Sequence, residues 1–474
     1  MIPVCTPQEM AAVDAAASEP LEVLVDRAGA AVARAVLDEL GGGYGRRVAV
    51  LAGKGTNGAD GRAAAERLTR RGVRCSVFDA ASSPDSLPRP GDHAVDMVVD
   101  AAYGTGLGRP YEAPAVDAPV LAVDVPSGLD GLTGETQGRP MSAVRTVTFA
   151  ALKPGLLFGH GPTLAGRVEV VDLGLDVSGA STHLLEDADV AGLVPARPAD
   201  AHKWRSACWV VAGSSGMEGA AALATTAAQR AGAGYVRLTM PGGDPGADAA
   251  AVPTEVVRST VIPADADEAA RFASLVVGPG LGTGPTTSTV VDAVLAAATA
   301  ANRPVVVDGD GLTALAANPE VRVWPAAGAV LTPHDGEFAR LAGGPPGPDR
   351  LSVARTLAAD TGATVLLKGP TTVVAAPDGQ VLLAAAGDTR LATAGSGDVL
   401  AGILGAFLAR GSDPLSAAAA AAHVHGRLVT QDTNDGAPTT GVVAGDLAAR
   451  LVAVLVNLGV DAEPNSRRQS GGVC

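Results

Sequence analysis

Short apolar runs alternate with alanine-rich stretches along most of the chain. In the first part the apolar runs occupy residues 47–53, 73–79, 96–104, 120–128, 145–151 and 167–175. Because these runs are continuous rather than alternating, they are typical of strands covered on both faces. A helix is predicted over 61–72, between the first two strands, and Gly72 ends it. This succession predicts an α/β fold with a mostly parallel sheet.

A second series of the same kind follows. Its apolar runs occupy 207–216, 235–240, 274–284, 303–312, 328–336 and 363–370, with a helix predicted over 219–232 and a hairpin over 372–384. Between the two series, residues 176–207 are rich in turn-forming and acidic residues. We therefore predict two α/β domains, at 1–180 and 206–460, joined by a linker at 181–205. The polar tail, 461–474, is expected to be disordered.

Composition narrows the class of protein. The 474-residue chain is 47% hydrophobic, enough for sizeable cores, and no apolar run reaches about 18 residues without interruption. The N-terminus lacks the features of a secretory signal and the four cysteines lie far apart, so we expect a cytoplasmic protein without a zinc site. A net charge of −15 disfavours nucleic-acid and anionic-membrane surfaces. An anionic ligand would have to be held by glycine amides and a few cations.

Lysine is rare and unusually placed. Only four of the 35 basic residues are lysines, and each lies beside glycine, proline or histidine: Lys54, Lys153, Lys203 and Lys368. Chance placement in an arginine-biased composition is one explanation. We favour a functional one, because a compact ammonium group binds phosphate differently from a guanidinium group.

The stretch TAGSGDVLAG at 393–402 comes directly before an apolar run that is typical of a buried helix. Gly395 and Gly397 leave amide groups bare at the positive end of that helix, which favours an anion. Asp398 in the same stretch has two explanations. It can cap the helix, or it can handle a proton or a metal beside a bound phosphate. The stretch alone leaves both open.

Three glycine-rich loops follow predicted strands of the first domain, where a parallel sheet presents its binding crevice. They are GKGTNGADG (53–61), DAAYGTGLGRP (100–110) and DVPSGLDG (124–131). Turn chemistry alone explains many residues of this kind. Several oxygen-bearing side chains with little local positive charge are also suited to a monovalent cation.

With TPQEM near the N-terminus, these three loops resemble the NAD(P)H-hydrate epimerase domain of the YjeF N-terminal family over roughly residues 1–180. The resemblance implies a Rossmann-like three-layer αβα sandwich that binds K⁺ through Asn57, Asp100 and Ser127. It also implies a catalytic and substrate-binding role for Asp124. The further substrate contacts that it implies are Thr56, Asn57, Gly58, Ala59, Asp60, Gly104, Thr105, Gly106, Leu107, Gly108, Arg109 and Pro110.

One loop departs from that family. The family's loop usually reads Asn-Asn-Gly-Gly-Asp, whereas this chain has Thr56 and Ala59. Threonine keeps a hydroxyl group, but alanine adopts a positive φ only at a cost. We therefore expect the backbone of this loop to be altered at residue 59.

The second series carries GSSGMEGAA, GPGLG, TPHDGE, LLKGPTT and TAGSGDVLAG, in an order that resembles the ADP-dependent NAD(P)H-hydrate dehydratase over about 200–455. The resemblance implies a ribokinase-like fold and an ADP that enters with Mg²⁺. The residues implied to hold the adenylate are Lys368, Gly369, Pro370, Thr371, Thr372 and Gly397. Those implied to contact the hydrated nucleotide are Ala220, Gly282, His334 and Asp398. Taken alone, His334 is better explained as a structural loop histidine.

Together the two resemblances imply a bifunctional repair enzyme, both isomerase and lyase. It would interconvert the R and S epimers of hydrated NADH or NADPH and dehydrate the S epimer, turning ADP into AMP and phosphate. Asp398 would then be the catalytic base. The expected partners are these small molecules only, in a homo-oligomer.

Two alternatives remain. A ribokinase-like vitamin kinase would not explain the loops of the first domain. A binding or scaffold protein on an inactive epimerase fold is disfavoured by the intact residues Asn57, Asp100, Asp124 and Ser127.

Overall fold

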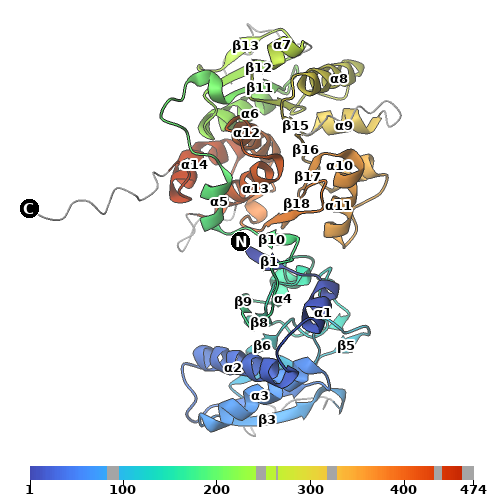
Figure 1. Ribbon diagram of the computed structural model, residues 1–474, viewed down its shortest axis with the longest axis vertical. Coiled ribbons are helices and arrows are strands. Elements are labelled where there is room, and N and C mark those ends of the chain that lie inside the picture. Colours follow the sequence, from blue (N-terminus) through green and yellow to red (C-terminus); the bar gives the residue numbers. More distant parts are fainter. Residues whose placement is uncertain (83–94, 242–251, 263–264, 318–327, 432–439, 462–474) are drawn as a thin grey trace, which may run out of the picture. The chain divides into compact units, whose positions relative to one another are not determined.

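The computed structural model describes residues 1–82, 95–241, 252–262, 265–317, 328–431 and 440–461. The chain forms two compact units, one spanning Ile2–His183 and the other running from Leu184 onward together with Met1 (Figure 1). Every helix in the described ranges is too short or too polar to cross a membrane. The tail that we predicted to be disordered lies, beyond Asp461, outside the described residues.

The N-terminal unit is built on a six-stranded parallel sheet. Its strands lie in the order β3-β2-β4-β6-β8-β9. They are β2 (Arg47–Ala52), β3 (Arg74–Asp79), β4 (Met97–Ala101), β6 (Val120–Val123), β8 (Arg145–Phe149) and β9 (Arg167–Val171). Each of the six predicted apolar runs contains one of these strands, and the predicted parallel sheet is confirmed.

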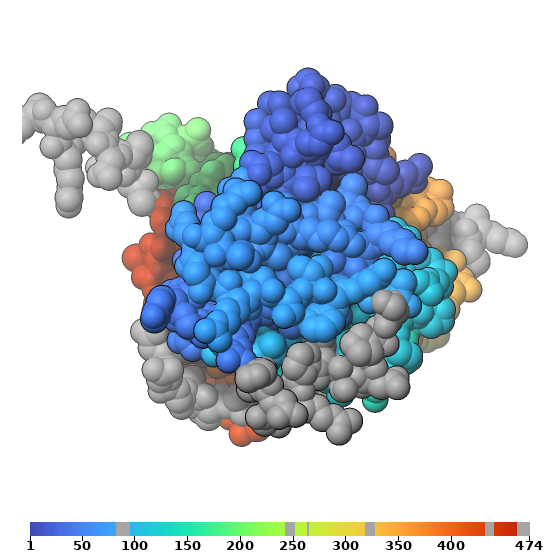
Figure 2. Space-filling model, turned by 90° about the horizontal axis from the view of Figure 1, so that it is seen from below, coloured from blue at the N-terminus to red at the C-terminus, as the bar shows by residue number. Residues whose placement is uncertain are grey.

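The two faces of this sheet are covered differently. Helices α2 (Leu21–Leu40) and α3 (Thr56–Arg70) pack on one face, where Val36 and Leu68 are fully buried. The other face is covered by segments that carry Tyr111 and Met141. Strand β3 is one of the two edge strands, and its side chains are mostly exposed on the side seen in Figure 2. The remaining elements are β1 (Ile2–Val4), α1 (Pro7–Ala15), β5 (Tyr111–Glu112), β7 (Gly138–Arg139) and α4 (Gly161–Leu164).

Helix α3 begins five residues earlier than predicted, at Thr56 instead of residue 61. Residues 56–60 are therefore the first turns of the helix and not a loop. Gly58 makes this start possible, because a Cβ atom there would lie only 1.9 Å from the carbonyl oxygen of Gly53. Ala59 is helical and is not among the residues with positive φ. The structure therefore gives residue 59 a helical backbone, which alanine adopts without strain.

The C-terminal unit carries a second, larger sheet. Its strands lie in the order β19-β18-β17-β16-β15-β14-β11-β12-β13. All neighbours from β17 to β13 are parallel, and β17-β18-β19 is antiparallel, as expected for the predicted hairpin over 372–384. The strands are β11 (Ala207–Val211), β12 (Tyr235–Thr239), β13 (Val257–Ser259), β14 (Ser274–Val277), β15 (Val305–Val307), β16 (Ala329–Leu331), β17 (Thr364–Leu367), β18 (Thr372–Ala375) and β19 (Val381–Ala384).

Helices cover both faces of this sheet (Figure 1). One face packs against α6 (Glu218–Arg230), α12 (Ser396–Ala409), α13 (Pro414–Thr430) and α14 (Ala444–Asn457). The other packs against α8 (Pro285–Ala300), α9 (Asp310–Ala317) and α10 (Asp335–Ala342). Helices α7 (Ala266–Ala269) and α11 (Arg350–Thr361) complete the unit. Every residue of α12 from Val399 to Ala409 is buried, so its polar N-terminus is fixed in place by a wholly apolar body.

The segment that we predicted to be a linker has structure of its own. It contains β10 (Thr182–Leu184) and α5 (Asp187–Leu193). Leu185, Val190 and Val194 are buried in the core of the C-terminal unit. Turn and acidic residues suggested a linker, but the three apolar side chains give this segment enough buried surface to dock.

Candidate active sites

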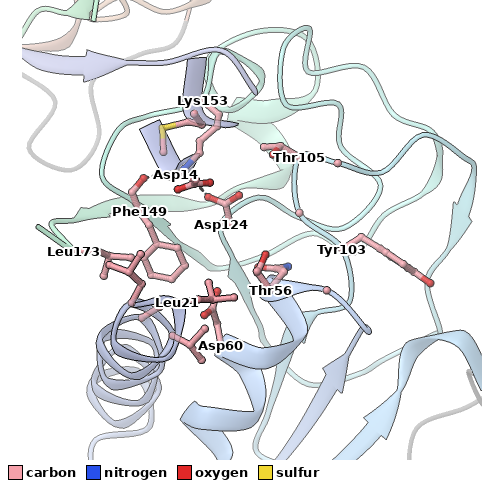
Figure 3. A pocket seen from close by; sticks show the side chains of 18 of the residues that line it. Asp14, Leu21, Thr56, Asp60, Tyr103, Thr105, Asp124, Phe149, Lys153 and Leu173 are labelled. Carbon is pink, nitrogen blue, oxygen red and sulfur yellow. Dashed lines mark hydrogen bonds and ion pairs between the residues drawn. The ribbon is translucent and has the colours of Figure 1, made fainter. Parts of the chain in front are cut away.

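The N-terminal unit contains an open cavity of about 780 Å³. It lies at the carboxyl ends of β4 and β6 and beside α1, α2 and the start of α3. Leu21, Phe149 and Leu173 form an apolar side, and Thr56, Tyr103 and Thr105 lie opposite (Figure 3). A cavity with one apolar wall and one polar wall is suited to a ligand that has a ring and polar substituents.

Charged side chains gather between those walls. Lys153 is 3% exposed, and its Nζ lies 2.6 Å from Asp124 Oδ1. Asp14 lies beside this pair (Figure 3). Burial raises the pKa of Asp14, Lys153 opposes that rise, and Asp124 adds to it. Burial also raises the pKa of Asp60 to about 8, helped by the carboxylates of Asp124 and Asp14. The carboxyl group of Asp60 is therefore mostly protonated near neutral pH.

A second group of polar side chains comprises Asp100, Ser127 and Asn57, of which Asn57 lines the cavity. Asp100 is fully buried, and its carboxylate accepts hydrogen bonds from Ser127 Oγ at 2.6 Å and Ser127 N at 2.9 Å. Burial raises the pKa of Asp100, against these hydrogen bonds. Asn57 is 8% exposed, and neither Oδ1 nor Nδ2 of its buried amide has a hydrogen-bond partner. Buried amides are rarely left in this state without a bound ligand or water.

Most of the predicted substrate contacts line this cavity. Those that do are Thr56, Asn57, Asp60, Gly104, Thr105, Gly106, Leu107, Gly108, Arg109 and Asp124. Gly58, Ala59 and Pro110 are not part of its lining. Sequence reasoning missed Asp14 and the apolar wall, and it did not name Tyr103 as a contact although Tyr103 lies in the predicted loop of residues 100–110. Lys153 was marked by the scarcity of lysine, but its partner Asp124 could not be inferred from the pattern.

In the C-terminal unit the predicted motifs meet at the carboxyl ends of the parallel strands. Lys368 follows β17, and its Nζ lies 2.6 Å from Oδ1 of Asp308, which follows β15. Thr332, after β16, donates a hydrogen bond to the same oxygen at 2.6 Å. Burial acts to lower the pKa of Lys368, but the carboxylates of Asp308 and Glu337 outweigh it and raise the pKa. Lys368 is therefore a fixed positive charge.

The N-terminus of α12 reaches this charge. A Cβ atom at Gly397 would lie 3.5 Å from Lys368 Nζ and 3.9 Å from Asp308 Oδ2. Asp398 is the next residue, and burial raises its pKa to about 7; Asp308 and Asp310 add to the rise and Lys368 opposes it. The N-cap of α12 is Gly395, and no side chain caps the helix. The capping explanation of Asp398 thus has no support in this part of the structure.

The other predicted residues of this unit lie in two groups. Gly282 N donates to Asp310 Oδ2 at 2.7 Å, and a Cβ atom at the nearby Gly280 would touch Ala220. His334 is the N-cap of α10, where its Nδ1 accepts hydrogen bonds from Gly336 and Glu337. His334 thus has a structural role as a cap, and its side chain is more than half exposed, so the predicted substrate contact stays a prediction.

The residues predicted to hold the adenylate lie between and beside β17 and β18, except Gly397, which lies in α12. Arg350 donates to the carbonyl oxygen of Lys368 at 2.7 Å and pairs with Asp335, so it fixes the backbone just before Gly369. Gly369 and Pro370 are exposed, Thr371 is buried and Thr372 is half-buried. Sequence reasoning missed Asp308, Asp310 and Arg350. The DGDG sequence at 308–311 was the available signal for the two aspartates.

Comparison with known proteins gives a separate family match for each of the two units. A family model described as NAD(P)H-hydrate dehydratase matches residues 208–451, and one described as YjeF-related protein N-terminus matches residues 21–90 and 78–155. The chain is 41% identical over 451 residues to the bifunctional NAD(P)H-hydrate repair enzyme of Mycobacterium leprae, covering 89% of this chain and 92% of that protein.

Two solved structures resemble the C-terminal unit. A ribokinase-like superfamily protein from Enterococcus faecalis has a TM-score of 0.53 at 23% identity, covers 59% of this chain and 97% of its own, and shows the predicted fold. An ADP/ATP-dependent NAD(P)H-hydrate dehydratase from Bacillus subtilis, co-crystallized with ATP/Mg²⁺, has a TM-score of 0.50 at 29% identity over 58% of this chain and 97% of its own. The matches span both units, and the chain belongs to the family of bifunctional NAD(P)H-hydrate repair enzymes.

Proposed function

We propose that the chain repairs hydrated NADH and NADPH through two linked activities. The N-terminal unit, residues 1–180, interconverts the R and S epimers at C6 of the hydrated ring. The C-terminal domain, residues 206–460, dehydrates the S epimer with ADP and releases AMP and phosphate. The family matches and the names of the relatives support both activities. An epimerase on the same chain supplies the dehydratase with the epimer it consumes.

The dehydratase proposal rests on the position of Asp398 at the N-terminus of α12, beside Lys368 and Gly397. Asp398 takes the proton of the C6 hydroxyl, whose oxygen attacks the β-phosphorus of ADP while AMP leaves. The ring nitrogen then expels phosphate from C6, and loss of a proton from C5 restores the dihydropyridine. The amides of α12 and the charge of Lys368 stabilise the negative charge on the phosphoryl group in transit.

The nucleotide is held by the residues around β17. Lys368 offers its ammonium group, Gly369 its bare amide, and Thr371 and Thr372 their hydroxyls to the phosphates. Mg²⁺ bound with the nucleotide would offset phosphate charge. Asp308 and Asp310 would offer it carboxylate oxygens, although Asp308 Oδ1 is paired with Lys368 and Asp310 Oδ2 accepts a hydrogen bond from Gly282 N.

Epimerisation requires a proton to move at the C6 hydroxyl, whichever bond to C6 breaks. Asp124 is the residue we assign to this step, because its carboxylate lies in the cavity at the end of β6. The hydrated ring lies against Phe149 and Leu173, and the loop of residues 104–110 holds its amide and ribose side.

The donor set of Asn57, Asp100 and Ser127 fits K⁺. Asn57 offers an amide oxygen that has no hydrogen-bond partner, and it lies beside Gly104 in the loop after β4. Ser127 and the buried Asp100, which are hydrogen-bonded to each other, supply further oxygens. Bound there, K⁺ would be held by the oxygens of Asn57, Asp100 and Ser127, and would link the start of α3 to the ends of β4 and β6.

The test is incubation of mixed hydrated NADH epimers with ADP, following the absorbance of regenerated NADH and the phosphate released. Complete conversion of both epimers, one phosphate for each NADH, is expected. Without ADP, the epimers should equilibrate and no NADH should form. A stable phosphorylated product would instead support a kinase.

For the cation, epimerisation is compared in K⁺ and Na⁺ buffers, in the unchanged chain and in Asp100→Ala. K⁺ should accelerate epimerisation only in the unchanged chain, and dehydration of pure S epimer should be the same in both. An equal rate in the two salts would contradict the K⁺ assignment.

A further inference from the structure

The deepest charge in the N-terminal cavity is Lys153, for which the two activities described so far provide no role. Its Nζ lies 2.6 Å from Asp124 Oδ1, donates to Thr148 Oγ1 at 2.9 Å and donates to the carbonyl oxygen of Phe149 at 3.0 Å. An ammonium group has three protons to donate. With three acceptors around it and 3% exposure, this one is held in a single orientation.

Asp124 is held on one side only. Its Oδ1 forms the ion pair with the Lys153 ammonium group and accepts a hydrogen bond from Thr148 Oγ1 at 3.1 Å. Its Oδ2 points the other way, toward the loop after β4, where a Cβ atom at Gly104 would lie 3.4 Å from it. Gly104 lines the cavity, so the missing side chain leaves the space in front of Oδ2 open to a ligand.

The backbone at Asp124 is also constrained. Its φ is +67°, a value that residues other than glycine seldom adopt, and Ala150, next to the Lys153 acceptor Phe149, has φ +62°. Such conformations are unfavourable and persist only where the surroundings enforce them. The Lys153 contacts join the two strained positions, one after β6 and one after β8. They thereby hold the carboxylate at the cavity.

We infer that Lys153 is a positioning residue for epimerisation: it fixes Asp124 Oδ1 so that Oδ2 faces the C6 hydroxyl of the hydrated nicotinamide ring. The inference rests on the proposed epimerase function. The alternative role of a buried cation near Asp14, Asp60 and Asp124 is purely structural: it would offset the repulsion between the carboxylates and keep the unit folded. The two roles differ in what they predict when Asp124 is already absent.

The experiment is a double-mutant cycle on the full chain with Lys153→Met and Asp124→Asn. Lys153→Met should lower kcat for epimerisation ~10- to 100-fold, as expected for a misplaced catalytic group, with KM changed much less. In the Asp124→Asn background, Lys153→Met should cause little further loss, because the group that it positions is gone. Dehydration of pure S epimer should stay normal in all three variants, and a matched Lys203→Met variant should behave as the unchanged chain.

Folding is measured separately, by thermal melting of each variant. If Lys153→Met does not fold, Thr148→Val replaces it, since Thr148 links Lys153 to the same oxygen; a smaller loss of kcat, again absent in the Asp124→Asn background, is expected. Losses that multiply in the double variant, or an unchanged kcat, would overturn the inference. Full activity of Asp124→Asn would overturn the role of Asp124 itself, and no epimerisation by the unchanged chain would overturn the proposed function.

Discussion

Lys368 Nζ and Asp308 Oδ1 are 2.6 Å apart, although sixty positions separate the two residues in the chain. They follow β17 and β15, and Thr332, which follows the strand between them, donates to the same oxygen. The cation is therefore oriented by two neighbouring strand ends before any ligand arrives. Groups that are already oriented stabilise a developing charge without a cost of reorganisation.

Replacing Lys368 with Met should weaken binding of ADP. One hydrogen bond from a charged donor to a phosphate is worth ~10- to 100-fold in affinity. Calorimetric titration of ADP into the variant measures the effect, and epimerisation by the same sample serves as the control. Unchanged ADP affinity would place the phosphates elsewhere.

The rate of dehydration should depend on pH through Asp398. A base must be ionised to accept a proton, so kcat/KM should rise with pH, with a midpoint close to the raised pKa of about 7. The Asp310 carboxylate contributes to that rise, so Asp310→Asn should move the midpoint to lower pH. Initial rates with pure S epimer across neutral pH provide the measurement. A flat profile around neutrality would be inconsistent with Asp398 as the base.

Most strands of the two large sheets could be predicted from the sequence because the central ones are continuous apolar runs buried on both faces. The short strand β13, with exposed side chains, was missed. The sites could be predicted in part for a related reason. Parallel strands bring their carboxyl ends to one edge, so motifs far apart in sequence, such as LLKGPTT and TAGSGDVLAG, had to meet there. The pairing of Lys368 with Asp308 could not be predicted, because it depends on which strands are neighbours in the sheet.

Local patterns were least informative where packing decides the structure. The start of α3 depends on Gly58 lying against the backbone of Gly53, a contact that no periodicity reveals. The apolar wall of the N-terminal cavity includes Leu21 and Leu173, from opposite ends of the domain sequence. Lys153 was marked only by the scarcity of lysine, and Asp14 was not marked as a site residue; that both lie at the same cavity as Asp124 appears only when α1 and the segment after β8 are placed.

The docked segment after residue 181 leads to a prediction about fragments. A fragment of residues 181–474 keeps β10 and α5, and should fold and dehydrate the S epimer only. A fragment of residues 195–474 loses the burial of Leu185, Val190 and Val194, which is worth ~1.5–3 kcal/mol for each side chain. It should melt at a clearly lower temperature or fail to fold. Equal melting temperatures for the two fragments would mean that this segment is a linker after all.

Ala59→Gly tests the departure of this chain from the usual epimerase loop. Residue 59 is helical here, so glycine should destabilise α3 by up to ~1 kcal/mol and should not increase the rate of epimerisation. Thermal melting and initial epimerisation rates measure the two effects. A faster epimerase with unchanged stability would show that a left-handed conformation at residue 59 is needed during turnover.

Asp398→Asn separates catalysis from structure in the C-terminal unit. The change keeps the size of the side chain, and no side-chain hydrogen bond caps α12, so the melting temperature should change by no more than a few degrees. An amide cannot accept the hydroxyl proton, and loss of a general base costs ~10²–10⁴ in rate. Regeneration of NADH from the S epimer should therefore fall at least ~100-fold, while ADP binding through Lys368 and epimerisation in the N-terminal unit are retained. Near-normal turnover would remove Asp398 from the mechanism, and a large fall in melting temperature would show that its carboxylate stabilises the unit in a way its surroundings do not reveal.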